Sequence, residues 1–98
     1  MSEYEGKFRD ERLRGEHARR LLEDGLLQEA FAKVDASIIG KWRNEETIGP
    51  ENRERLWMML GLLARVKAHI AEVAKTGELA AQSLAEIEAR KESGNERR

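Results

Sequence analysis

The longest regular pattern of hydrophobic positions lies in residues 50–76, and its spacing is that of a helix. Apolar residues recur there at alternating steps of three and four: Leu56, Met59, Leu63, Val66, Ile70 and Val73. Residues at these steps stack along one side of a helix. We therefore expect a helix over residues 50–76 and take it as the core of the fold.

A second apolar stripe lies beside the first and is interrupted by Lys67. It consists of Trp57, Leu60, Ala64, Ala71 and Ala74. The combined face is too wide for one partner helix to cover, so we expect the uncovered part to form an oligomer interface. That predicted interface is the second stripe together with two apolar residues further along, Leu84 and Ile87. Met58 and Leu62 lie off both stripes, and part of this apolar run is expected to face another subunit or protein.

The segment before a polar connector at residues 44–49 predicts a second amphipathic helix, over residues 25–44. Its apolar positions step by four, three, four and four: Leu27, Phe31, Val34, Ile38 and Trp42. Asp24 is placed to cap its N-terminus, and Pro50 falls in the first turn of the next helix, where proline is tolerated. A short connector favours antiparallel neighbours, so we expect a helical hairpin. Its four layers would pair Ile38 with Leu56, Val34 with Met59, Phe31 with Leu63, and Leu27 with Val66.

The stripe of the core helix keeps its phase beyond residue 76. Ala80, Leu84 and Ile87 continue it, with Gly77 at one core position. Either Gly77 ends the helix, as glycine often does, or one helix continues to about residue 92. The preserved phase favours the continuous helix. We expect one helical domain over residues 1–92 and a disordered tail over residues 93–98, which carry no apolar side chain.

The N-terminal segment predicts a weaker helix. Ser2 and Glu5 have the spacing of a capping box. Its apolar residues are too sparse for a continuous buried face, and Gly6 and Gly15 each cost about 1 kcal/mol relative to alanine inside a helix. We expect a solvated N-terminal helix that frays.

Composition supports an all-α fold and excludes several kinds of site. The 98 residues include one proline, no cysteine and a nearly balanced 18 basic and 19 acidic residues, for a net charge of −1. The lack of cysteine excludes disulfides and thiolate metal sites. The first 14 residues have no apolar core of the signal-peptide kind, and no run approaches the roughly 18 apolar residues of a membrane span. We expect a soluble protein of the cytoplasm, without membrane contact.

Candidate chemistry is scarce. His17 and His69 lack a second ligand at the spacing of a helical metal site, and no nucleophile elbow or phosphate-binding loop is present. We expect no enzyme activity, no metal and no cofactor. A basic cluster could contact nucleic acid, although acidic residues at neighbouring helix positions nearly cancel its charge. Its candidate contacts are Arg12, Arg14, Arg19 and Arg20.

Several short motifs together resemble a known group of proteins. They are Leu21-Leu22, Leu26-Leu27-Gln28-Glu29-Ala30-Phe31, Trp42-Arg43, Arg53-Glu54-Arg55-Leu56-Trp57, Val66, His69 and Thr76-Gly77-Glu78-Leu79-Ala80. This pattern resembles short, mostly uncharacterised proteins of tailed phages and prophages. The resemblance implies a small helical virion-assembly or packaging protein, similar to the oligomerisation part of a small terminase subunit.

Three functions follow as hypotheses. The first is a non-enzymatic, coiled-coil-like oligomeric scaffold or adaptor in phage genome packaging or head assembly. Its partners would be further copies of the chain and another phage packaging or head protein, in the host cytoplasm or the virion. The second is a DNA-binding small terminase subunit that recognises the packaging site. The third is a small inhibitor or regulator of a host protein.

Overall fold

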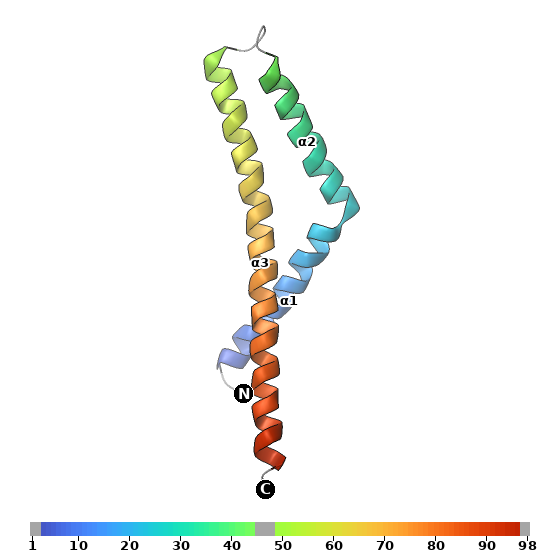
Figure 1. Cartoon of the computed structure of the whole chain (residues 1–98), viewed down its shortest axis with the longest axis vertical. Coiled ribbons are helices and arrows are strands. Elements are labelled where there is room, and N and C mark those ends of the chain that lie inside the picture. The colour runs from blue at the N-terminus through green and yellow to red at the C-terminus, as the bar shows by residue number, and fades with distance from the viewer. Residues whose placement is uncertain (1–2, 45–48, 97–98) are drawn as a thin grey trace. The chain divides into compact units, whose positions relative to one another are not determined.

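The computed structural model describes residues 3–44 and 49–96, and these residues form three helices (Figure 1). Helix α1 spans Glu3–Glu23, α2 spans Gly25–Arg43 and α3 spans Pro50–Glu96. Within the described ranges there is no strand, which confirms the all-α prediction. Ser2, the first residue of the predicted capping box, lies outside the described residues, as does most of the predicted connector.

Helix α2 begins and ends where the sequence predicts, because both ends are capped. The Asp24 backbone is extended, and its carboxylate Oδ1 accepts a hydrogen bond from the Leu27 backbone N–H at 2.8 Å. This contact satisfies one of the amide donors that the first turn of a helix leaves free. At the other end, the Asn44 N–H donates to the Lys41 carbonyl oxygen at 3.3 Å.

Helix α3 is continuous through Gly77, so the second of the two alternatives is correct. The helix ends at Glu96, four residues beyond the predicted end at residue 92. Residues 93–96 of the segment predicted as a disordered tail are therefore helical. No proline follows Pro50 to end the helix, and Lys91 in its C-terminal part forms an ion pair with Glu5 of α1.

The chain divides into two compact units, residues 1–20 with 71–98 and residues 21–70, and each is described by itself. In the second unit, α2 runs antiparallel to residues 50–70 of α3 (Figure 1). Ile38 is its buried hydrophobic residue, at 5% exposure. The Lys67 ammonium reaches Asp35 Oδ2 at 3.4 Å, and it lies 5.5 Å from the centre of the Phe31 ring.

These contacts involve a side chain that the predicted layer pairing leaves out. Phe31, expected opposite Leu63, has the Lys67 ammonium over its ring, one helical turn further along α3. Lys67 is therefore part of this contact and not an interruption of the apolar face. A lysine can do this because its aliphatic stem covers apolar surface while its charged end reaches Asp35.

The apolar face of α3 is also rotated from the prediction. Three residues placed in buried layers are exposed: Val34, Met59 and Val66. The partly covered residues of α3 in this unit are instead Arg53, Leu56, Leu60, Leu63 and Ile70. Leu60, assigned from sequence to the second stripe, thus shares the covered side with Leu56 and Leu63.

Helix α1 is exposed over much of its length, as predicted, but it also has a narrow buried side that the sequence analysis did not predict. Its buried residues are Glu5, Gly15 and Ala18, whereas Tyr4 and Leu13 are exposed. The buried side of this helix includes the small residues Gly15 and Ala18. A pattern of large apolar side chains does not reveal a buried side of this kind.

Candidate interaction surfaces

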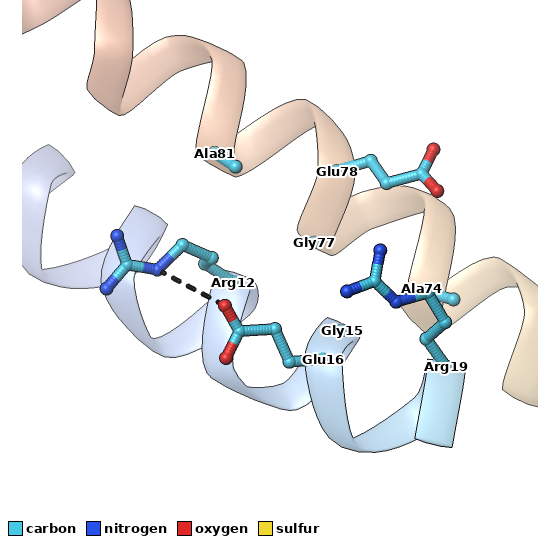
Figure 2. A pocket seen from close by; sticks show the side chains of 8 residues that line it. All are labelled: Arg12, Gly15, Glu16, Arg19, Ala74, Gly77, Glu78 and Ala81. Carbon is cyan, nitrogen blue, oxygen red and sulfur yellow. Dashed lines mark ion pairs between the residues drawn. The ribbon is translucent and has the colours of Figure 1, made fainter. Parts of the chain in front are cut away.

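The closest helix contact in the first unit joins two glycines. In Figure 2, Gly15 of α1 faces Gly77 of α3. A Cβ atom added at Gly15 would lie 2.5 Å from the Gly77 Cα and 3.2 Å from the Val73 carbonyl oxygen. A Cβ added at Gly77 would lie 2.5 Å from the Gly15 Cα and 2.9 Å from the Glu11 carbonyl oxygen. Because all of these neighbours are backbone atoms, only glycine fits at either position.

A small pocket beside this contact holds two of the arginines considered for nucleic-acid binding. It is lined by Arg12, Gly15, Glu16, Arg19, Ala74, Gly77, Glu78 and Ala81 (Figure 2). Arg12 Nε is buried and lies 4.0 Å from Glu16 Oε1. The two guanidinium groups therefore share this surface with two carboxylates, and their charges are balanced locally. Arg14 and Arg20 are exposed on α1 outside the pocket lining.

A charged contact also joins α1 to the last turns of α3. The Lys91 ammonium donates to both carboxylate oxygens of Glu5, at 3.1 and 3.2 Å. The Glu5 side chain is 11% exposed and the Lys91 side chain is 61% exposed. A carboxylate at that degree of burial needs a hydrogen-bonding partner, and Lys91 supplies one.

Of the residues predicted to form an oligomer interface, some are covered within the chain and others are exposed. Ala74 lines the pocket beside Gly15 and Gly77. Leu84 and Ile87 are half-buried, on the same side of α3 as Gly77 and Lys91, which contact α1. Leu60 is half-buried, whereas Trp57, Ala64 and Ala71 are exposed. Part of the predicted interface is thus covered within the chain, and the assignment of the rest to an oligomer stays a prediction.

An exposed apolar groove runs along α3 in the second unit. It is lined by Trp57, Met58, Leu60, Gly61, Leu62 and Arg65. Trp57 is 66% exposed, and Met58 and Leu62 are each 57% exposed. A Cβ added at Gly61 would meet no atom within 4 Å, so the glycine leaves a notch in the helix surface. The apolar run was singled out from sequence, but the notch at Gly61 was not.

A second pocket lies where α2 ends and α3 begins. It is lined by Trp42, Pro50, Arg53, Glu54 and Trp57. The Arg53 guanidinium carbon lies 4.5 Å from the centre of the Trp42 ring, a cation–π contact between the two helices. Both tryptophans of the chain, Trp42 and Trp57, line this pocket.

Gly15 and Gly61 are the residues that sequence reasoning missed. A signal for Gly15 was present, because Gly15 and Ala18 are small residues spaced by three, as are Ala74 and Gly77 on α3. Small residues at one helix face allow a second helix to approach closely, a contact that a count of large apolar residues overlooks.

No protein-family model, curated protein or solved structure matches the chain. Within residues 3–44 and 49–96, no three histidine, cysteine or acidic side chains are grouped so that they could hold a metal ion. None of the helices, searched over the same residues, has the length and apolarity to cross a membrane.

Proposed function

We propose that the protein is a non-enzymatic helical scaffold or adaptor that acts as a coiled-coil-like homo-oligomer. One observation carries the proposal, the imbalance between buried and exposed apolar residues. Among the described residues, the buried hydrophobic ones are Ala18, Ile38 and Ala80. Large apolar side chains are exposed at twelve positions: Tyr4, Leu13, Leu21, Leu26, Val34, Ile39, Trp57, Met58, Met59, Leu62, Val66 and Leu79.

Self-association would relieve this imbalance. Apolar surface in water is unfavourable by roughly 25 cal/mol per Å², and contiguous exposed apolar patches mark interaction sites. The five large exposed apolar residues from Trp57 to Val66 fall within ten positions of one helix, so one partner helix could cover several of them together.

We further propose that this scaffold acts in phage genome packaging or head assembly, which the resemblance of its sequence motifs to those of tailed-phage proteins supports. The motifs that carry the resemblance include the Trp42-Arg43 and Arg53–Trp57 segments, and Trp42, Arg53 and Trp57 from these segments line the pocket between α2 and α3. Tryptophan and arginine are enriched where proteins bind each other, which supports a protein partner for a scaffold of this kind.

Sedimentation velocity over the micromolar range tests the oligomer. We expect a species heavier than the 11.2 kDa chain, with a population that grows with concentration. A protein that sediments as a monomer throughout would overturn the proposal.

The assembly role has its own test, which uses head and packaging proteins encoded beside this chain in a phage genome. We expect one of them to bind the purified oligomer and to co-elute with it in size-exclusion chromatography. If none binds, the packaging role is wrong even when the oligomer forms.

A further inference from the structure

One face of α3 carries the groove at Gly61 together with a pair of opposite charges. Glu54, Met58, Gly61 and Arg65 follow one another at steps of four, three and four, so they share one side of the helix. Trp57 and Leu62 lie next to this row and line the same groove as its last three members. All of these residues are exposed.

The groove has the arrangement of a hole for a side chain from a second helix. Met58, Gly61, Leu62 and Arg65 stand at positions i, i+3, i+4 and i+7, the four positions that surround an inserted side chain in knobs-into-holes packing. Gly61 contributes no side chain to this hole, and no atom occupies the space above it. A long and flexible apolar side chain would fit this space best.

The same face supplies such a side chain. Met58 is 57% exposed, and methionine adapts its shape to irregular apolar gaps. When two copies of the helix are laid antiparallel with Met58 of each over Gly61 of the other, two further pairings follow from the sequence spacing. Glu54 comes opposite the partner's Arg65, and Trp57 comes opposite the partner's Leu62. The face is therefore complementary to itself in both charge and apolar character.

Two other observations favour a second copy as the occupant. Within the described part of the chain, neither Glu54 nor Arg65 forms an ion pair, so both charges are available to a partner. The chain also uses the same device internally, since Gly15 and Gly77 let two of its helices approach to backbone contact.

We propose that a second copy of this chain docks antiparallel on this face of α3, with Met58 of each copy in the notch at Gly61 of the other. The inference rests on the proposed homo-oligomer and names its interface. A symmetric dimer buries the same patch on both subunits, and a patch that complements itself meets that requirement.

Filling the notch is the first test, and the chain offers a matched control. Gly40 of α2 is also an exposed helical glycine whose added Cβ would meet nothing within 4 Å. Both Gly61→Leu and Gly40→Leu raise helix propensity, so neither is expected to unfold its helix. We expect Gly61→Leu to weaken the dimer by about tenfold or more in sedimentation equilibrium, because a filled hole excludes the knob. Gly40→Leu should leave the dimer unchanged.

The outcomes separate this inference from the proposed function. If wild type is oligomeric and Gly61→Leu dissociates no more than Gly40→Leu, the interface is wrong while the oligomeric scaffold stands. If wild type is a monomer, both are wrong. An oligomer larger than a dimer that responds only to Gly61→Leu supports the interface as one of its contacts.

Exchange of the two charges tests the antiparallel register. We expect Glu54→Arg and Arg65→Glu each to weaken the dimer, since each places like charges opposite one another. The double variant restores the opposite-charge pairs and should recover most of the affinity. Failure of the double variant to recover would overturn the register.

Cross-linking gives a direct geometric check because the chain has no cysteine of its own. A mixture of Met58→Cys and Gly61→Cys chains should form a mixed disulfide under mild oxidation, since the proposed packing brings these two positions together. A mixture of Met58→Cys and Gly40→Cys chains should not. Equal yields in the two mixtures would contradict the proposed packing.

Discussion

The two units hold their helices together in opposite ways. In the first unit, contact is made by backbone and by the smallest side chains, with Gly15 against Gly77. In the second unit, α2 and α3 meet through long side chains, as in the contact of Lys67 with Phe31 and Asp35. The distance between packed helices depends on the side chains at the contact, so the two contacts must respond differently to substitution.

A contact made by backbone atoms leaves no room for an added side chain. A contact made by long side chains tolerates small shifts but weakens when atoms are removed, because removal leaves unfilled space. We therefore expect side-chain truncation to be harmful in the second unit and an added methyl group to be harmful in the first.

The largest effect is expected from truncation in the second unit. Ile38 is 5% exposed and its neighbour Ile39 is 36% exposed, so the two form a matched pair in one helix turn. We expect Ile38→Ala to lower the free energy of unfolding by about 2 to 4 kcal/mol, through lost burial and an unfilled cavity. Ile39→Ala should cost about 1 kcal/mol or less.

Urea denaturation followed by circular dichroism, at one fixed protein concentration, measures both variants. The concentration must be fixed because any self-association contributes to apparent stability. Equal losses for Ile38→Ala and Ile39→Ala would show that α2 does not pack on α3 through Ile38.

The next effect comes from adding one methyl group in the first unit. Gly15→Ala raises helix propensity by about 1 kcal/mol but places a Cβ 2.5 Å from the Gly77 Cα. Overpacking of this kind costs about 1 to 3 kcal/mol, so we expect a net loss of stability despite the better helix former.

Gly6→Ala is the control on the same helix, because a Cβ at Gly6 would meet nothing within 4 Å. It should stabilise the protein by about 0.5 to 1 kcal/mol. Amide hydrogen exchange shows where in the chain the stability is lost. Gly15→Ala should speed exchange in α1 and leave exchange in residues 27–40 of α2 unaffected. If Gly15→Ala stabilises as much as Gly6→Ala, the glycine contact is absent in solution.

The contrast between the units also explains what the sequence could predict. The start and end of α2 and the continuity of α3 were correct, because caps and heptad phase are local signals. The packing of α1 was missed because its buried residues are Glu5, Gly15 and Ala18, none of which is a large apolar residue. Gly15 was interpreted as a weak point in a helix, yet it is the point of closest contact.

Two of the four predicted layers are wrong for a related reason, because Val34, Met59 and Val66 are exposed. Periodicity places residues on one face of a helix. It does not tell how the helix is rotated about its axis to better than about one residue, which corresponds to about 100°. Leu60 was therefore assigned to the second stripe, and Lys67 was interpreted as an interruption of that stripe, although Lys67 contacts α2. A lysine that packs by its stem has no signature in a pattern of apolar residues. The notch at Gly61 was missed because its shape depends on several side chains around the glycine, which come from two turns of the helix.

The smallest expected effect concerns the ion pair between Glu5, near the start of α1, and Lys91, near the end of α3. Glu5 is largely buried and accepts from Lys91 at 3.1 Å, whereas the Lys91 side chain is mostly exposed. Solvent therefore screens the lysine, and Lys91→Ala should cost only about 1 kcal/mol, mainly because Glu5 loses a donor. Lys67→Ala in the second unit should cost a similar amount, because it removes both the contact with Asp35 and the contact with Phe31.

A double-mutant cycle between positions 5 and 91 sharpens this last comparison. We expect a coupling free energy of about 0.5 to 1 kcal/mol between Glu5→Ala and Lys91→Ala, since the two side chains form one contact. Glu5→Ala paired with Lys67→Ala is the control, because those side chains form no contact with each other and their effects should add. Additivity in the first pair as well would mean that this ion pair contributes no measurable stability in solution. The glycine contact would then hold α1 to α3 without help from this ion pair.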